Sequence, residues 1–309
     1  MGLSAISPTL LIASLMVAAT PILLAALGEL VVEKAGVLNL GVEGMMIVGA
    51  VCGFIVGVET GSPWLGFLGA AVAGAGMALL FGVLTQVLLS NQVATGLALT
   101  LFGLGLSSLL GQGYVGIKAA TLGRLDFGPL SDLPVVGRVV FGHDPIVYLS
   151  LALVVAVWFV LARTRAGLIL RAVGESHDAA HALGYRVRRV RMLAIAFGGA
   201  CAGLGGAYLS LVRVPQWTDG MTSGAGWIAL AIVVFASWRA GRVLIGAYLF
   251  GGITVLQLNL QTAGARVPVE VLSAAPYLVT ILVLVLISIR AGRGGDAPAD
   301  LGKPFHASA

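Results

Sequence analysis

Long apolar segments recur along the whole chain, and they restrict its fold more than any other feature. Hydrophobic residues make up 59% of the 309 positions and charged residues only 10%, whereas soluble domains carry about 25% charged residues. Runs of roughly 20 apolar residues can cross the hydrocarbon core of a bilayer as helices. They are continuous, without the period of two that a transmembrane barrel shows. The sequence therefore predicts an all-α, polytopic transmembrane helical bundle.

The apolar windows predict about nine spans, within a range of about 8–10. The second window contains Glu43 between Gly41 and Gly44, so we expect a discontinuous or bent helix there. One transmembrane domain would cover residues 1–290. The Gly- and Pro-containing tail at 291–309 is expected to be flexible and cytoplasmic. The nine windows lie near residues 7–28, 36–58, 64–89, 93–114, 145–162, 191–212, 224–238, 243–263 and 271–290.

Positive charge is distributed unequally between the loops. With an external N-terminus, thirteen of the 18 Lys and Arg residues lie on or beside inner loops and five on outer ones. The positive-inside rule therefore predicts an N-out, C-in topology. The predicted outer loop is 115–144 and the largest inner loop is 163–190. Because the charge clusters at segment ends, it indicates membrane topology and not a nucleic-acid partner.

Sequence motifs for catalysis or for metal binding are absent from the chain. It contains no phosphate-binding GxxxxGK[ST] loop, no HExxH and no Cys/His cluster. His177 and His181 are four residues apart, but a solvated helix surface explains that spacing better than zinc. Cys52 and Cys201 lie in apolar segments, where packing is the expected role. We expect a protein that is not an enzyme and holds no cofactor or metal.

Polar residues at membrane depth are the candidates for a translocation path or gate, because such groups are costly in lipid. Glu43, with Asn39 nearby, begins an otherwise apolar run. The alternative is that Glu43 lies at the inner interface, within reach of water and Lys34. A second polar group starts the fourth window, where it could cap the helix or donate hydrogen bonds in the path. This second group consists of Asn91, Gln92 and Thr95.

Seven of the fifteen arginines fall between residues 163 and 191, and a short helix is predicted inside this stretch. Ser176 can cap it and Gly184 can close it in a left-handed conformation. Its small apolar face, formed by Ala179, Ala180 and Leu183, could dock into a groove of a partner. The alternative is an ordinary basic loop whose arginines meet acidic groups or lipid phosphates. The predicted coupling residues are Glu175, Ser176, His177, Asp178, Ala179, Ala180, Leu183 and Gly184.

Four stretches, taken in order along the chain, together form a specific pattern. They are Glu33 to Met46 (EKAGVLNLGVEGMM), Asn91 to Gly103 (NQVATGLALTLFG), Arg171 to Glu175 (RAVGE) leading to Gly184-Tyr185, and Pro215 to Gly224 (PQWTDGMTSG) with Gly226 to Ala231 (GWIALA). These stretches closely resemble ABC importer permeases of the nucleoside and simple-sugar branch, distant relatives of the branched-chain amino acid permeases. One departure is Ser176-His177, where relatives commonly carry Asn-Pro.

The resemblance implies a multi-pass permease subunit in the cytoplasmic (inner) membrane of a bacterium. Its implied partners are an ABC ATPase, an extracytoplasmic substrate-binding lipoprotein, membrane lipids and a second related permease, with a heterodimer favoured over a homodimer. Transport would proceed by alternating access, and the 175–184 helix would be seated on the ATPase. Gln216, Trp217 and Thr222 would contact the receptor or the outer mouth.

Two alternatives to nucleoside import remain at this point. One is an ABC permease for amino acids or another small solute, against which the GVEGMM signature argues. The other is a secondary transporter driven by protons or sodium, in which Glu43 would carry the coupling. The nucleoside or simple-sugar substrate follows from the resemblance alone.

Overall fold

The computed structural model describes residues 8–130, 136–262 and 297–306, with single positions at 274, 278, 281, 282 and 285. Regular structure within these residues is helical, and only isolated β-bridges occur. Seven of these helices are long and apolar enough to cross a membrane. They are α1 (Pro8–Lys34), α2 (Val42–Thr60), α3 (Pro63–Gly82), α4 (Gln92–Gly111), α6 (Pro145–Arg163), α9 (Val187–Tyr208) and α11 (Ala240–Thr262).

Short elements extend or connect these spans. π-Helical turns continue α3 and α9, as η2 (Val83–Val87) and η5 (Leu209–Arg213), and a 3-10 turn, η3 (Gln112–Tyr114), continues α4. The remaining elements are η4 (Gly128–Leu130), α5 (Val136–Val140), α7 (Arg165–Glu175), α8 (His177–Ala182) and α10 (Ala225–Phe235).

The predicted count of nine spans is only partly supported. Seven windows coincide with membrane-length helices. The window at 224–238 forms α10, which has only 11 residues and at about 1.5 Å per residue covers roughly half of the hydrocarbon core. The window at 271–290 lies outside the described residues apart from single positions. The first span was predicted to end near residue 28, but α1 continues to Lys34 because neighbouring elements bury its last turns.

The beginnings of several helices follow from local side-chain chemistry. Ser62 caps α3 by accepting a hydrogen bond from the Leu65 amide, and Pro63 occupies the first helical position. Asp144 caps α6 in the same way, again followed by proline. A side-chain acceptor satisfies an amide that has no partner within the helix, and proline has no amide to satisfy. These signals set where α3 and α6 begin.

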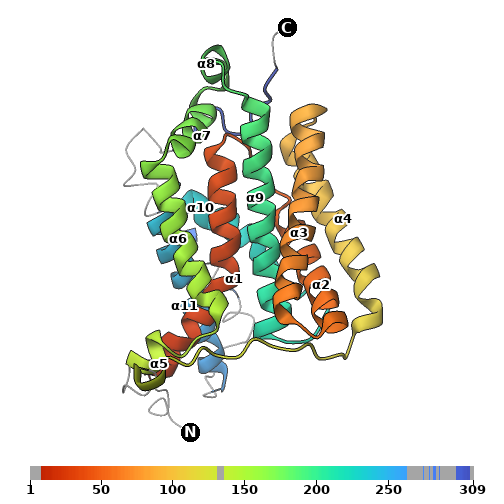
Figure 1. Cartoon of the computed structure of the whole chain (residues 1–309), viewed down its shortest axis with the longest axis vertical. Helices are drawn as coiled ribbons and strands as arrows, with labels where there is room; N and C mark the ends of the chain where they lie inside the picture. The colour runs from red at the N-terminus through yellow and green to blue at the C-terminus, as the bar shows by residue number, and fades with distance from the viewer. Residues whose placement is uncertain are drawn as a thin grey trace.

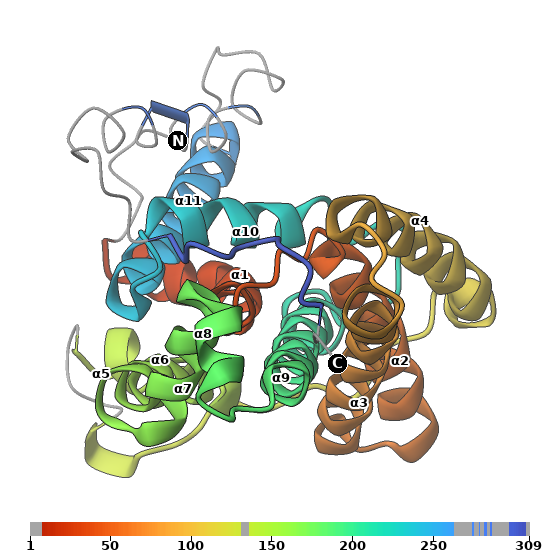
Figure 2. The same cartoon turned by 90° about the horizontal axis from the view of Figure 1, so that it is seen from above.

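Helices α1 and α9 run through the middle of the bundle, with α2, α3 and α4 on one side and α6 on the other (Figures 1 and 2). Close backbone contact depends on glycine. A Cβ atom added at Gly49 in α2 would lie 2.3 Å from the Gly203 Cα atom of α9. Small residues allow such contact in membranes, where van der Waals packing holds helices together.

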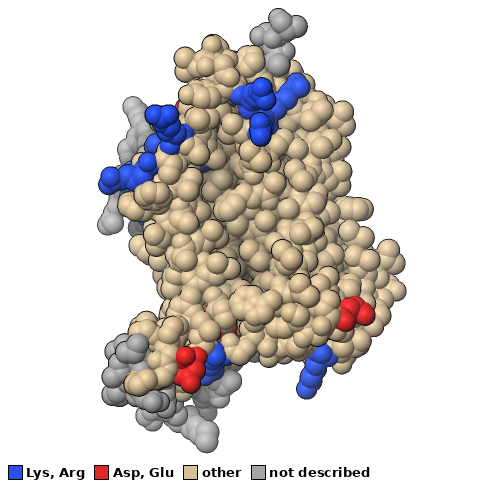
Figure 3. Space-filling model, in the orientation of Figure 1, with Lys and Arg blue, Asp and Glu red and all other residues tan. Residues whose placement is uncertain are grey.

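The two ends of the bundle differ in composition. Helices α7 and α8 and the segment 297–306 lie at one end, and the chain after α4 crosses the other (Figure 1). Lys and Arg side chains gather near α7 and the start of α9, whereas the opposite end shows both charge signs (Figure 3). The predicted inner loop 163–190 and outer loop 115–144 therefore lie at opposite ends. Which end faces the cytoplasm remains a prediction from charge.

Candidate functional site

The second predicted span is irregular where polar residues begin it. Residues 36–41 are not helical, and α2 starts at Val42. Side chains of α4 satisfy this backbone: Gln92 Oε1 accepts from the Leu38 amide at 2.8 Å, and Thr100 Oγ1 donates to the Leu40 carbonyl at 3.1 Å. Non-helical backbone at membrane depth needs such partners. Gln92, a predicted path residue, thus supports the backbone.

The other polar candidates near this stretch also make local contacts. Asn39 is buried, and its Oδ1 atom accepts from the Gly41 amide at 2.9 Å, which forms a tight turn. Asn91 caps α4 by accepting from the Ala94 amide at 3.0 Å. Thr95 Oγ1 lies 2.8 Å from Ser90 Oγ. Of the two interpretations of Asn91, the geometry favours capping.

Glu43 is placed very differently from an interfacial residue. Only 3% of it is exposed, and it lies in the first turn of α2. One oxygen accepts from Thr222 Oγ1 at 2.5 Å and from the Gly224 amide at 2.9 Å, and the other accepts from the Gly226 amide at 2.7 Å. A predicted path residue and a predicted outer-mouth residue are therefore in direct contact.

The amides that Glu43 binds belong to the start of α10. Gly224 precedes this helix in a left-handed conformation, with φ of +83°, and makes no side-chain cap of its own. The first amides of a helix lack internal partners and carry the positive end of its dipole, so a carboxylate is well suited to them. A Cβ atom at Gly226 would lie 2.6 Å from the Glu43 Cα atom. We call Glu43, Thr222, Gly224 and Gly226 the carboxylate clamp.

A cavity of about 390 Å³ adjoins the carboxylate clamp. It lies between α1, η5, the loop before α10, and α11, and its size falls within the usual range for small-molecule sites. Thr222 both borders this cavity and binds Glu43. The wall combines apolar groups such as Phe250 with several hydrogen-bonding side chains. The polar lining residues are Arg213, Thr218, Thr222, Ser223, Thr254 and Gln257.

The other outer-mouth candidates lie along the loop that leads to this cavity. Trp217 is 1% exposed, and its indole packs so closely on Gly111 that no Cβ atom could fit there. Gln216 is exposed, and its backbone forms an isolated antiparallel β-bridge with that of Lys118. Asp219 accepts a hydrogen bond from Ser108 Oγ at 2.9 Å. These contacts attach the loop to the end of α4, so Trp217 serves as an anchor, and of these two candidates Gln216 is the exposed one.

Two buried carboxylates were missed from the sequence. Glu29 and Glu33 are 1% and 0% exposed in the last turns of α1, a stretch that lies between the first two predicted spans, 7–28 and 36–58. Glu33 accepts a hydrogen bond from the Trp238 indole, and each carboxylate has one oxygen without a partner among the described residues. Their spacing of four residues on one helix face was the available signal.

The predicted coupling helix is present but shorter than expected. Helix α8 spans His177–Ala182, while Glu175 ends α7. Ser176 Oγ accepts from the Ala179 amide at 3.2 Å, and Gly184 is left-handed with φ of +88°. Ser176 therefore caps the helix as predicted.

The predicted apolar face needs a correction. Ala180 is 2% exposed because it packs against Val173, Val187 and Phe305 of the same chain. Leu183 is 75% exposed, and Ala179 is exposed as well. Only these last two apolar residues of the predicted face remain available to a partner.

The C-terminal segment packs on this region, contrary to the prediction of a flexible tail. Phe305 is buried, and Asp300 Oδ2 accepts from the His177 amide at 2.9 Å and lies 2.8 Å from His177 Nδ1. Burial alone would raise the pKa of Asp300, but hydrogen bonds from Lys303 and from the His177 amide, with the charges of both residues, bring it below its ordinary value. The correction applies to residues 297–306.

Arg191, at the start of α9, connects these elements and was counted only as one of many basic residues. It is fully buried. Its guanidinium donates to the Ala35 carbonyl at 3.2 Å, the Lys303 carbonyl at 3.0 Å and Gln86 Oε1 at 3.4 Å. Five donors in a planar group suit such a junction. We call Arg191 with these three acceptors the guanidinium junction.

Comparison with known proteins identifies the kind of molecule. Residues 11–288 match the family described as branched-chain amino acid transport system / permease component. The chain is 44% identical to a putative glucose ABC transporter permease protein, TsgC13, of Haloferax volcanii, over 88% of this chain and 90% of that one. It is 32% identical to the guanosine ABC transporter permease protein NupQ of Bacillus subtilis, over 96% of both. A nucleoside ABC transporter permease protein, NupC, of Lactococcus lactis is 30% identical over 90% and 92%.

Proposed function

The chain belongs to the family of branched-chain amino acid transport system permease components, and we propose on that premise that its solute passes along the cavity beside the carboxylate clamp. It is a multi-pass ABC transporter permease of the inner membrane for sugars or nucleosides. This identity argues against the proton- or sodium-driven alternative, because ABC transport is driven by a partner ATPase. The amino acid alternative loses support, since these relatives carry sugars or nucleosides by name.

One observation carries the proposal: Thr222 is shared between the cavity wall and Glu43. Movement of α2 relative to α10 would pull on Thr222 through this hydrogen bond and reshape the wall. Helix α10 is a half-length helix whose N-terminus points at a polar group within the bundle. Transporters commonly build solute sites from such discontinuous helices. Alternating access would then change the shape of the cavity by rearranging the clamp.

The chemistry of the wall supports a polyhydroxylated solute. Threonine, serine and glutamine side chains both donate and accept hydrogen bonds, as the hydroxyl groups of a sugar do. A hexose and the ribose of a nucleoside share this pattern, which agrees with relatives named for glucose and for nucleosides. We propose that the ring hydroxyls lie against Thr254, Gln257 and Ser223 of the cavity.

A transport assay with paired threonine variants tests the path. Thr254 borders the cavity and donates to the Phe250 carbonyl, whereas Thr60 lies outside it at the end of α2 and donates to the Val56 carbonyl. Both threonines therefore have the same local bond. In proteoliposomes of the assembled importer, Thr254→Val should raise the KM for labelled glucose or guanosine about 10-fold, and Thr60→Val should leave it unchanged. Equal KM values would remove the cavity from the path.

The other end of the molecule is proposed to engage the ATPase. The exposed Ala179 and Leu183 are four residues apart on one face of the α8 region, and the C-terminal segment holds α8 in place through Asp300 and Phe305. The charge distribution favours a cytoplasmic position for this end, with an external N-terminus. A second permease, paired as a heterodimer, and a substrate-binding lipoprotein near Gln216 complete the proposed importer.

Co-purification tests the role of α8. Ala179→Asp with Leu183→Asp should abolish recovery of the ATPase, because two carboxylates would be buried in the interface. His306→Asp adds a carboxylate at an exposed position of the same end and should leave recovery unchanged. Full recovery of the ATPase with the double variant would exclude α8 as the coupling element.

A further inference from the structure

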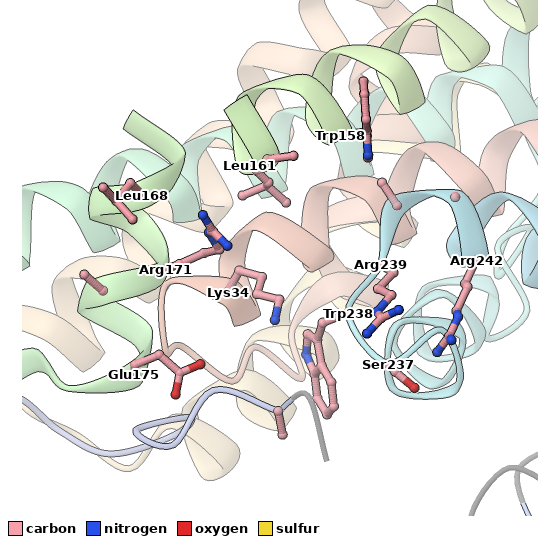
Figure 4. A pocket seen from close by; sticks show the side chains of 15 residues that line it. Lys34, Trp158, Leu161, Leu168, Arg171, Glu175, Ser237, Trp238, Arg239 and Arg242 are labelled. Atoms are coloured by element: carbon pink, nitrogen blue, oxygen red, sulfur yellow. The ribbon is translucent and has the colours of Figure 1, made fainter. Parts of the chain in front are cut away.

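A second cavity, of about 900 Å³, lies at the basic end of the bundle and plays no part in the proposed solute path. It is bounded by the end of α1, by α6 and α7, and by the turn between α10 and α11 (Figure 4). Four cationic side chains and one carboxylate line it. The charged lining residues are Lys34, Arg171, Arg239, Arg242 and Glu175.

The cations come from elements far apart in the sequence, and the fold brings them together. Figure 4 shows Arg171 of α7 on one side, Arg239 of the α10–α11 turn and Arg242 of the first turn of α11 on the other, and Lys34 between them. Among the described residues, neither Arg171 nor Arg242 takes part in an ion pair. An arrangement of guanidinium groups around one space is suited to a phosphate oxyanion.

One wall of this cavity is apolar and exposed. Trp158 is 50% exposed, and Leu168 of α7 is 59% exposed. The wall continues along α6 through Val155 and Phe159, which are 62% and 53% exposed. A tryptophan beside basic residues at the end of a span is typical of the membrane interface. The cationic cavity therefore opens onto a surface that suits acyl chains.

We propose that this cavity binds the headgroup of an anionic phospholipid, with an acyl chain lying along α6. A soluble phosphate compound would use the cations but not the exposed tryptophan and leucine. Docking of the ATPase is a separate matter, since the cavity lining includes no residue of α8. Basic pockets between spans on the cytoplasmic side are known to suit such headgroups. This inference requires that the chain is inserted in a membrane, and it does not depend on which solute is transported.

Native mass spectrometry of the full chain, purified with its partners, tests the proposal directly. Protein exchanged into an equimolar mixture of phosphatidylglycerol and phosphatidylcholine with identical acyl chains should retain phosphatidylglycerol at least fivefold in excess. The double variant Arg171→Gln/Arg242→Gln should lose this preference. Arg188→Gln/Arg189→Gln removes two exposed charges of the same end outside the cavity and should keep it. Equal binding of the two lipids by the unaltered chain, or an unchanged preference in Arg171→Gln/Arg242→Gln, overturns the proposal.

Fluorescence distinguishes the lipid from a free phosphate and does not require the double variant. Brominated phosphatidylglycerol in vesicles should quench the tryptophan emission more than brominated phosphatidylcholine, and Trp158→Phe should remove that difference. Inorganic phosphate or glycerol 3-phosphate at about 10 mM should not restore the tryptophan emission that brominated phosphatidylglycerol has quenched. This concentration is on the order of that of cellular phosphate and well below the effective lipid concentration in a bilayer. Full recovery with either soluble compound would assign the site to free phosphate and overturn the lipid proposal.

Discussion

The carboxylate clamp and the guanidinium junction both supply hydrogen-bond partners to buried polar groups near helix ends, and they do so with opposite charges. Glu43 gathers one hydroxyl and two amide donors at the beginning of a helix. Arg191 gathers two carbonyl acceptors and one amide oxygen near the end of α1. Backbone groups at helix ends lack internal partners, and in a low-dielectric interior an unpaired group is costly.

The difference between them lies in what each connects. The clamp joins α2 to α10 beside a cavity, so a change there alters the proposed solute path. The junction joins α1, α9, the π-helical turn after α3 and the C-terminal segment, so it holds the end that carries α8. We infer that the first governs solute handling and the second governs the position of the coupling end.

The largest effect is expected at Glu43. Glu43→Ala leaves three donors without an acceptor, which should lower the free energy of unfolding by about 3–5 kcal/mol and abolish uptake. Glu43→Gln keeps one acceptor oxygen and should fall between this variant and the original chain. Thermal unfolding in detergent measures the loss of stability of each variant, and labelled-solute uptake measures its loss of transport. Stable and fully active Glu43→Ala protein would show that the clamp has no role.

A somewhat smaller loss is expected at Arg191. Arg191→Met keeps an unbranched apolar stem but leaves the Ala35 and Lys303 carbonyls without their donor, at a cost of about 2–4 kcal/mol. The released C-terminal segment should become sensitive to protease. Solute affinity, measured by binding to the purified importer, should stay unchanged. A weakened solute affinity with a protease-resistant tail would contradict the inference that the clamp governs solute handling and the junction governs the coupling end.

Packing at the clamp gives the next test. Gly226→Ala places a methyl group 2.6 Å from the Glu43 backbone, and overpacking of this kind costs about 1–3 kcal/mol. Gly105→Ala in α4 meets no atom within 4 Å, so its helix propensity should stabilise the chain by up to about 1 kcal/mol. Unfolding temperatures that shift in the same direction for both variants would contradict the close approach.

The smallest effect concerns the tail. Because Lys303 and His177 lower the pKa of Asp300, this carboxylate stabilises the docked tail above its unfolded pKa of about 3.9, and that share is lost as pH falls through the lower folded value. Asp300→Asn should therefore reduce protease protection of the tail near neutral pH by about twofold. Protection equal to that of the original chain at pH 7 would assign docking to Phe305 alone.

Local signals explain why much of the fold was predictable. Apolar length located seven spans. The side chains of Ser176 and Asn91 mark helix starts because each binds its own neighbouring backbone, and Gly184 marks a helix end because it can adopt a left-handed backbone conformation. Such interactions span only a few residues, so the sequence shows both partners at once. The early end assigned to α1 failed because Glu29 and Glu33 look like loop residues unless their burial is known.

The amino-acid sequence alone determined that this chain spans a membrane as helices, that Glu43 is unusual, and that a capped helix lies within the basic loop. Only the tertiary structure decided that Thr222 binds Glu43 across 179 positions, that Arg191 differs from its neighbouring arginines, and that the C-terminal segment packs on α8. The reason is physical: burial and partnership of a polar group depend on which distant segments surround it, and that follows from how the helices pack.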